Sequence, residues 1–322
     1  METTIIGPGG VGLALASCLH VSGVGLSFLG RQHPPNPLFT TEGIHRSGIF
    51  GRAAVPPESL LFHSTWRSLA DQSPDYLLIC SKADALEEIG RGLQSAWPHF
   101  DSEPIVILCQ NGWGHFEKMT QWLPAKRIYN ARVITGFKRA AANRVEVTVH
   151  ADAIHIGSLA DAPLAPVRPL VEAISAGGIP CRASPEIEAD LIAKLLYNCL
   201  LNPLGALAQV PYGTLGEREE TRLLMESLAS EIFAVLEATG RETHWPSAEA
   251  YLDSFYRELL PPTAEHHSSM LQDLTAQRPT EIESLNGAIV RMGAEKGIPT
   301  PVNHALRTLI RAAESRPPAE PQ

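Results

Sequence analysis

Two groups of residues in this 322-residue chain could carry chemistry, and the first is a glycine-rich segment near the N-terminus. Gly7-Pro8-Gly9-Gly10-Val11-Gly12 has the spacing G-x-G-x-x-G and follows the β-like run Thr3-Thr4-Ile5-Ile6. In such a turn the first glycine permits a tight bend, the second lets the backbone approach a pyrophosphate, and the third lets helix and strand pack closely. The N–H groups that open the following helix then face the phosphates. The segment therefore predicts dinucleotide binding by Gly7, Gly9, Gly10, Val11 and Gly12.

The residues expected near the ribose favour a phosphorylated cofactor. About 20 residues beyond this motif, an NAD-binding chain usually carries Asp or Glu, whereas Leu29-Gly30-Arg31 stands here. An arginine suits a 2′-phosphate because its paired donors can grip the phosphate oxygens. Lys82, which follows the apolar run 76–80, adds a second positive charge. We therefore predict NADPH as the cofactor; the alternative for both residues is a solvated charge at a strand end.

The second group is a polar stripe on an apolar helix. Lys194, Asn198 and Asn202 are spaced four residues apart within 191–207, so they share one helical face. Burying an ammonium and two amides without partners would cost roughly several kcal/mol, so we expect them to line a cleft or meet a polar ligand. The alternative is a lysine that reaches solvent and amides bonded within the protein. Pro203 removes one helical hydrogen bond and is expected to bend the helix beside Asn202.

A third set of polar residues has the spacing of ordinary helix starts. Thr280 and Glu283 fit a capping box, which makes Glu283 a structural residue. Glu281 falls in the same first turn, where the helix dipole favours a carboxylate. Ser269 and Asp273 also fit a helix start with its first-turn acid. Spacing alone therefore assigns these residues to structure rather than to chemistry.

Short apolar runs alternate with helical stretches in the first half of the chain. Runs such as 76–80 and 104–109 are nearly continuous, as strands buried on both faces require. Their alternation with helices predicts a parallel, doubly wound sheet. Val145–Val149 and Ala153–Ile156 are expected to be antiparallel strands that close this domain.

The second half of the chain has almost no strand signal. Ser184-Pro185-Glu186 is a helix start, with serine as the cap and proline in the first turn, and helical periodicity continues to about Glu314. The predicted architecture is α/β. A Rossmann-type doubly wound parallel sheet occupies residues 1–183, and an all-helical domain occupies residues 184–322.

Composition restricts the functional class. The chain is 44% hydrophobic and 19% charged, which is typical of a soluble globular protein. Its net charge of −9 argues against broad binding to nucleic acid or anionic membrane.

The five cysteines form no C-x-x-C pair, so we expect reduced thiols and no metal site. Polar residues and glycines interrupt the apolar segment 11–29, which is not expected to span a membrane. The expected location is the cytoplasm.

These segments together resemble the ketopantoate reductases, NADPH-dependent enzymes that reduce 2-dehydropantoate to pantoate on the route to coenzyme A. The resemblance covers most of the chain. Besides the glycine motif, it is carried by Ser81-Lys82-Ala83, Gln110-Asn111-Gly112, Lys194…Asn198…Asn202-Pro203 and Ser268-Ser269-Met270…Asp273…Thr280-Glu281-Ile282…Asn286-Gly287. One departure is His266, where the family often has Asn before the paired serines.

The resemblance assigns roles that spacing alone does not. It implies Lys194 as the general acid that protonates the carbonyl oxygen, and it turns Glu281 from a capping residue into a catalytic-site residue that holds this lysine. It implies that Asn111 lies near the nicotinamide and the substrate. It also implies that Asn198, Asn202 and Ser269 bind the substrate.

The expected function is NADPH-dependent reduction of 2-dehydropantoate to pantoate, with a small 2-oxo acid as the partner molecule and no metal. The resemblance leaves a homodimer open. One alternative is a reductase of another 2-oxo acid or an imine reductase of the opine type. Another is a catalytically silent NADPH-binding regulator on the same scaffold, against which the retained Lys194 stripe argues. Oxidation of NADPH in the presence of 2-dehydropantoate separates these alternatives.

Overall fold

The computed structural model describes residues 1–30 and 35–315, which form two compact units. The first unit comprises Met1–Gln110 and His115–Ile187, and the second comprises Asn111–Gly114 and Glu188–Gln322. Within these ranges, residues 31–34 and 316–322 lie outside the part of the chain that the structure describes. No local pattern in the sequence indicates that the four residues after Gln110 group with the C-terminal helices.

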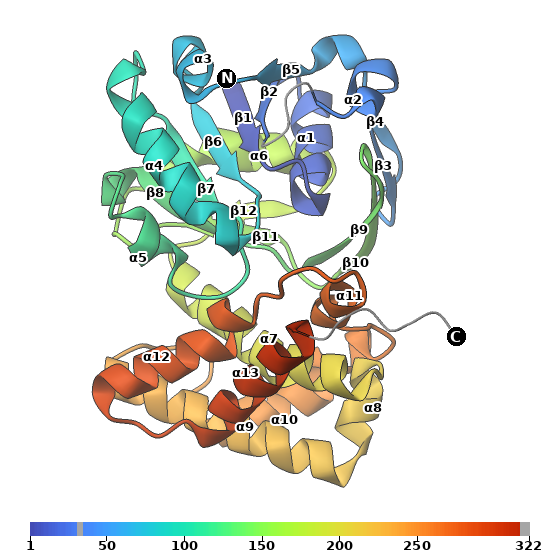
Figure 1. Ribbon diagram of the computed structural model, residues 1–322, viewed down its shortest axis with the longest axis vertical. Coiled ribbons are helices and arrows are strands. Elements are labelled where there is room, and N and C mark those ends of the chain that lie inside the picture. The colour runs from blue at the N-terminus through green and yellow to red at the C-terminus, as the bar shows by residue number, and fades with distance from the viewer. Residues whose placement is uncertain (31–34, 316–322) are drawn as a thin grey trace. The chain divides into compact units, whose positions relative to one another are not determined.

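The first unit is built on an eight-stranded sheet (Figure 1). Its strand order is β12-β11-β8-β7-β6-β1-β2-β5, and the six strands from β8 to β5 are parallel. The strands are β1 (Glu2–Ile6), β2 (Gly25–Leu29), β5 (Leu61–His63), β6 (Tyr76–Ile79), β7 (Ile105–Leu108), β8 (Ile128–Arg132), β11 (Ile154–Gly157) and β12 (Cys181–Ala183). The chain winds outward from β1 in one direction and then in the other, which confirms the predicted doubly wound sheet and puts the switch point between β1 and β6.

Helices cover both faces of this sheet, because alternate residues of each central strand are apolar on opposite sides. Ile5 and Leu78 pack in one core with α1 (Gly10–Val21) and α6 (Arg168–Ala176). Ile6 and Leu77 pack in the other core with α3 (Trp66–Gln72), α4 (Leu86–Ala96) and α5 (His115–Met119). The near-continuous apolar runs of the sequence are thus strands with no solvated face.

A second sheet belongs to the same unit, in the order β4-β3-β10-β9. Its strands are β3 (Ile44–Gly48), β4 (Ala53–Val55), β9 (Thr135–Ala141) and β10 (Arg144–His150), and the short α2 (Pro37–Thr41) precedes β3. The two segments expected to be antiparallel strands, 145–149 and 153–156, do pair in that way, but they belong to different sheets: β10 is antiparallel to β9 and parallel to β3, and β11 is antiparallel to β8. Alternation explains the difference: β10 buries only every second residue, such as Val145 and Val147, whereas β11 is buried throughout.

The second unit is helical, and its described residues contain no strand. Its helices are α7 (Ile187–Ala208), α8 (Tyr212–Glu217), α9 (Glu219–Thr239), α10 (Ala248–Ser254), α11 (Ser269–Thr275), α12 (Asn286–Lys296) and α13 (Pro301–Glu314). Within the described residues, α7 is the one helix whose length and hydropathy would allow a membrane crossing, and 72% of its apolar window is buried inside the protein. It is continuous through Pro203, so Lys194, Asn198 and Asn202 do share one helical face.

Candidate functional site

The turn between β1 and α1 requires glycine at two of its positions. Gly7 has φ +94°, and a Cβ there would lie 2.7 Å from the backbone nitrogen of Ser81. A Cβ on Gly12 would lie 2.6 Å from the carbonyl oxygen of Gly7 and 3.1 Å from the Ile5 side chain. The first glycine therefore makes the bend and the last lets α1 pack against β1, as the motif predicts.

Gly9 differs from these two glycines because no residue that the structure describes crowds it. It precedes the first turn of α1, and a Cβ there would come no closer than 3.8 Å to the Cys80 carbonyl oxygen. The first turn of α1 carries no acidic side chain, so its N–H groups form an uncancelled positive helix end. Open space above a bare backbone and a helix N-terminus is what a pyrophosphate needs, so this turn fits the phosphates of a dinucleotide.

Of the two cations expected around the ribose, Lys82 is among the described residues. β2 ends at Leu29, as the apolar run indicates, but Arg31 lies outside the described residues. Lys82 follows β6 at the start of a short 3₁₀ turn and is partly exposed. Beside it, the buried Gln110 side chain donates to the carbonyl oxygens of Ile79 (2.8 Å) and Ser81 (2.9 Å). Gln110 therefore fixes the backbone at the carboxyl end of β6, a role that the sequence did not indicate.

In the second unit, three predicted site residues meet in one hydrogen-bonded chain. Lys194 is half-buried on α7, and its Nζ donates to Oδ1 of Asn111 at 2.5 Å. Nδ2 of Asn111 donates in turn to Oε2 of Glu281 at 2.8 Å. The three residues lie far apart in sequence, with separations of 83 and 170 residues across the two hydrogen bonds. We call them the Lys194–Asn111–Glu281 chain.

The segment that carries Asn111 is fixed within the second unit by its next two residues. Gly112 has φ +98°, and a Cβ there would lie 2.3 Å from the carbonyl oxygen of Ser284. The Trp113 N–H donates to that same carbonyl at 2.8 Å. The Trp113 side chain is only 6% exposed, and the Arg241 guanidinium lies 4.6 Å from its ring centroid, a cation–π contact. Sequence reasoning missed Trp113 and Arg241 because no local pattern links residues so far apart.

The remaining predicted substrate residues occupy different environments. Asn202 is 4% exposed, and its Oδ1 accepts from the Tyr212 hydroxyl at 2.6 Å. Its backbone carbonyl accepts from the Ser268 hydroxyl at 2.8 Å, and Ser268 also caps α11. Ser269 is exposed in the first turn of α11, and Asn198 is half-buried on α7. Burial raises the pKa of the Tyr212 phenol, which therefore stays a neutral donor to Asn202.

The predicted capping box of Thr280 and Glu283 is wrong. Glu283 accepts from Nε of Arg307 with both carboxylate oxygens, each at 3.0 Å, and its Oε2 lies 3.6 Å from Arg291. The Thr280 hydroxyl donates to Glu314 at 2.7 Å. Arginines of α12 and α13 thus compete successfully for the carboxylate that would have capped the turn.

Glu281 also differs from its local expectation. The turn that follows it is a 3₁₀ helix, Ile282–Ser284, rather than the first turn of an α-helix. Glu281 makes no side-chain cap there, and its carboxylate accepts from Asn111 instead. The two glutamates therefore have different contacts. Glu281 accepts a hydrogen bond from the amide that contacts the lysine, and Glu283 forms ion pairs with arginines of α12 and α13.

The described cysteines are all free thiols. Burial raises the pKa of Cys18 and of Cys199, which keeps both thiols protonated and poorly nucleophilic. Within residues 1–30 and 35–315, no group of three or more His, Cys, Asp or Glu side chains is arranged to hold a metal ion.

Family models and known relatives match almost the whole chain. The model described as ketopantoate reductase PanE/ApbA matches residues 3–161, and the model of its C-terminal part matches residues 186–314. The 2-dehydropantoate 2-reductase of Aquifex aeolicus is 33% identical over 319 residues, covering 98% of this chain and 97% of that protein. The enzyme of the same name from Vibrio cholerae is 32% identical over 314 residues, covering 98% of each chain.

Solved structures are similar over the same length. A PanE/ApbA family ketopantoate reductase from Ralstonia eutropha aligns with a TM-score of 0.82 and 25% identity, covering 98% of each chain. A D-mandelate dehydrogenase, in a ternary structure with NADH and anilino(oxo)acetate, aligns with a TM-score of 0.83 and 23% identity, again over 98% of each chain. The second similarity concerns the fold alone.

Proposed function

The chain belongs to the ketopantoate reductase family, and from this premise we propose that it reduces 2-dehydropantoate to pantoate. Family membership makes it an NADP-dependent oxidoreductase. The observation that carries the proposal is the Lys194–Asn111–Glu281 chain, in which a lysine ammonium donates to an amide that donates in turn to a carboxylate. A cytoplasmic location and a place in pantothenate synthesis follow from the proposed reaction.

The β1–α1 turn is the proposed binding site for the cofactor phosphates. Gly9 and the open end of α1 would receive the pyrophosphate, and Lys82 together with Arg31 would take the 2′-phosphate. When bound, NADPH supplies the hydride that reduces the 2-oxo carbon. The protein contributes orientation and the proton.

Lys194 is the proposed proton donor. Reduction of a 2-oxo group leaves negative charge on the former carbonyl oxygen, and a proton delivered to that oxygen completes the alcohol. The ammonium has three N–H bonds, and Asn111 accepts one of them. We propose that this ammonium gives its proton to the substrate oxygen, and that the neutral amine which remains regains a proton from solvent.

Asn111 and Glu281 are proposed to position that ammonium and keep it charged. The Glu281 carboxylate accepts from the Asn111 amide, which polarises the amide and strengthens its oxygen as an acceptor. A stronger acceptor favours the protonated lysine, the form that reduction requires.

Asn198 and Ser269 are proposed to contact the substrate, since both are at least partly exposed polar side chains. For Asn202, the hydrogen bond from Tyr212 favours an indirect role, in which the buried amide orients α7 beneath Lys194. A second candidate function is reduction of another 2-oxo acid. It is favoured by the fold similarity to the D-mandelate dehydrogenase whose structure holds NADH and anilino(oxo)acetate.

Steady-state oxidation of NADPH with a panel of 2-oxo acids tests the proposal. The panel contains 2-dehydropantoate, unbranched and branched aliphatic 2-oxo acids, and benzoylformate. We expect the highest kcat/KM with 2-dehydropantoate and loss of turnover in Lys194→Ala. A higher kcat/KM with benzoylformate would support the second candidate, and no turnover with any acid would contradict both.

A further inference from the structure

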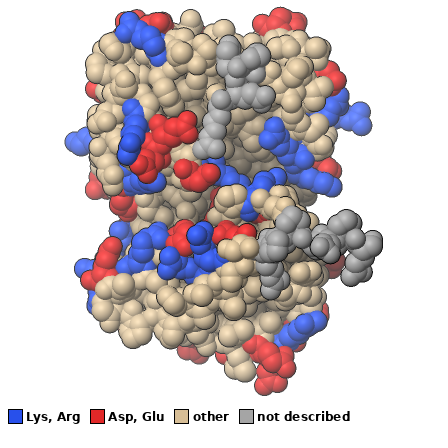
Figure 2. All heavy atoms as spheres, viewed as in Figure 1, with Lys and Arg blue, Asp and Glu red and all other residues tan. Residues whose placement is uncertain are grey.

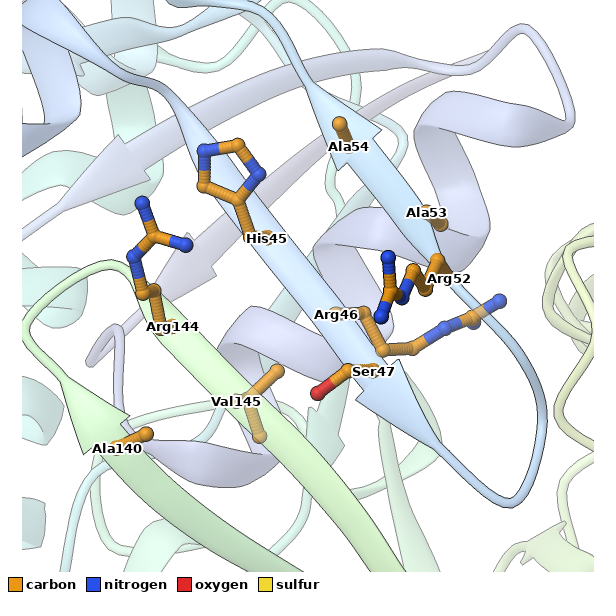
Figure 3. Close-up of a pocket in the computed structure, with 9 residues that line it drawn as sticks. All are labelled: His45, Arg46, Ser47, Arg52, Ala53, Ala54, Ala140, Arg144 and Val145. Atoms are coloured by element: carbon orange, nitrogen blue, oxygen red, sulfur yellow. The ribbon is translucent and has the colours of Figure 1, made fainter.

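The outer face of the second sheet carries a hollow of about 640 Å³ that the proposed reaction does not use. Residues of all four strands of this sheet line it, together with Arg52, which directly precedes β4 (Figure 3). Three of these residues, Ala53, Ala54 and Ala140, have short side chains, so the space between the larger residues stays open. None of the nine lining residues is acidic.

Alternation along β3 determines which side chains face the hollow. His45 and Ser47 are two residues apart and therefore lie on one face of the sheet. Arg46 points to the opposite face, where its Nη1 donates to Cys18 Sγ (2.8 Å) and to the Gly177 carbonyl (3.0 Å). Arg46 thus anchors β3 to the core, and the hollow lies on the side away from α1.

Four side chains supply hydrogen-bond donors to this hollow: His45, Ser47, Arg52 and Arg144. His45 is paired in register with Arg144 of β10 on one side and with Ala54 of β4 on the other. In Figure 3 the His45 imidazole lies beside the Arg144 guanidinium, and Arg52 extends from the start of β4 toward β3. We call His45, Ser47, Arg52 and Arg144 the sheet-face donors.

The charged side chains among the lining residues are all basic, although the formal charge of the whole chain is −9. Figure 2 shows Lys and Arg gathered on the flank of the first unit that carries this sheet. Arg144 pairs with Glu42 at 2.7 Å, but both side chains are about half exposed, so the pair is weak. Arg52 is exposed and forms no ion pair with any residue that the structure describes. One carboxylate, that of Glu146, lies beside Ser47 in the register of the sheet but does not line the hollow.

Two guanidinium groups, an imidazole and a hydroxyl around a small hollow are the donors that proteins use for phosphate. Guanidinium binds phosphate through paired hydrogen bonds, and a hydroxyl or imidazole N–H can donate to a further oxygen. We propose that the sheet-face donors bind the phosphate group of a small molecule. This site is separate from the β1–α1 turn and does not depend on the identity of the oxo acid.

Calorimetric titration of the full-length protein with inorganic pyrophosphate tests the proposal, at constant ionic strength because exposed charges are screened by salt. The titration is run without NADPH and again with saturating NADPH, whose phosphates would occupy the β1–α1 turn. We expect saturable binding in both cases. The double variant Arg52→Gln, Arg144→Gln should weaken it at least about 10-fold, because it removes both guanidinium groups and their charge-assisted hydrogen bonds to phosphate oxygens.

The matched control is Arg67→Gln, Arg91→Gln, which removes the same charge from exposed helix surfaces of the same unit. It should keep the affinity of the unmodified protein, and circular dichroism should show both double variants folded. Equal weakening in the two variants would mean that pyrophosphate responds only to overall charge, and it would overturn the proposal. Absence of saturable binding by the unmodified protein in the presence of NADPH would overturn it as well.

Discussion

The β1–α1 turn and the Lys194–Asn111–Glu281 chain are built in different ways. The turn presents backbone atoms to its ligand. Its glycines lie within six residues, and at Gly7 and Gly12 a Cβ would clash with neighbouring atoms. The Lys194–Asn111–Glu281 chain works through side chains that are 83 and 170 residues apart. Added side-chain atoms should therefore disrupt the β1–α1 turn, whereas the loss of a hydrogen bond should disrupt the Lys194–Asn111–Glu281 chain. Substitutions in the two regions should separate cofactor affinity from turnover.

The largest expected effect is that of Lys194→Ala. Loss of a general acid typically costs about 10²–10⁴-fold in rate, so kcat should fall by that factor. The dissociation constant for NADPH should change little, because the proposed phosphate site is formed by the β1–α1 turn. Steady-state kinetics and fluorescence titration of NADPH measure the two quantities. Lys296→Ala, which removes an exposed lysine at the end of α12, is the control; near-normal kcat in Lys194→Ala would eliminate the proposed proton donor.

The next effect concerns the two glutamates that flank Ile282. Glu281→Gln removes the charge that Asn111 contacts, and a hydrogen bond to a charged group is worth roughly 1.5–3 kcal/mol. We therefore expect kcat to fall about 10- to 100-fold. The loss of reduction at alkaline pH should also begin at lower pH, because a nearby carboxylate favours the charged lysine.

Glu283→Gln is the matched control for this prediction, since the same chemical change there affects only arginines of α12 and α13. It should lower stability slightly and leave the pH profile of kcat/KM unchanged. Identical profiles for the two variants would show that Glu281 has no special relation to the lysine.

Local patterns in the sequence were sufficient to predict the central strands of the first unit's main sheet and the glycine turn. β6 and β7 are continuous apolar runs, and such runs are typical of parallel strands buried on both faces. The shorter β5 and the polar β8 were not predicted. The second sheet was not predicted in full, because β3 and β4 have no long apolar run and because β3 joins the sheet by pairing with β10, about 100 residues away.

For the second site, residue types were more predictable than contacts. Lys194 stood out as a cation on an apolar helix, and burial cost alone indicated a polar partner. That Asn111 is this partner could not be predicted, because it follows a strand of the other unit in sequence. The capping-box pattern of Thr280 was misleading for a related reason: arginines of α12 and α13 determine where Glu283 points.

A pair of glycine substitutions should separate the two roles within the turn. In Gly9→Ala the new methyl group would enter open space, so the fold should persist while NADPH affinity falls. In Gly12→Ala the methyl group would meet the Gly7 carbonyl and Ile5, and overpacking of this kind typically costs about 1–3 kcal/mol. Chemical denaturation and NADPH titration of both variants provide the comparison. Equal destabilisation of the two variants would contradict the assignment of Gly9 to ligand contact.

The smallest expected effect is a pH dependence of stability that leaves the catalytic side chains untouched. His63 ends β5 and is 5% exposed, and burial lowers the pKa of its imidazole below the usual value near 6.5. The folded state therefore keeps His63 neutral, while the unfolded chain takes up a proton once the pH falls below about 6.5. Because stability rises with pH wherever the unfolded state binds more protons, the free energy of unfolding should decrease as the pH falls from about 6.5 toward the lowered pKa. Above that range, His63 should add no pH dependence.

Burial also lowers the pKa of His150 and of His266, so His63→Gln should make this dependence shallower without abolishing it. The measurement is the thermal unfolding midpoint against pH for the unmodified protein, His63→Gln and the exposed control His99→Gln. An unchanged slope in His63→Gln would show that this buried imidazole does not resist protonation in the folded protein.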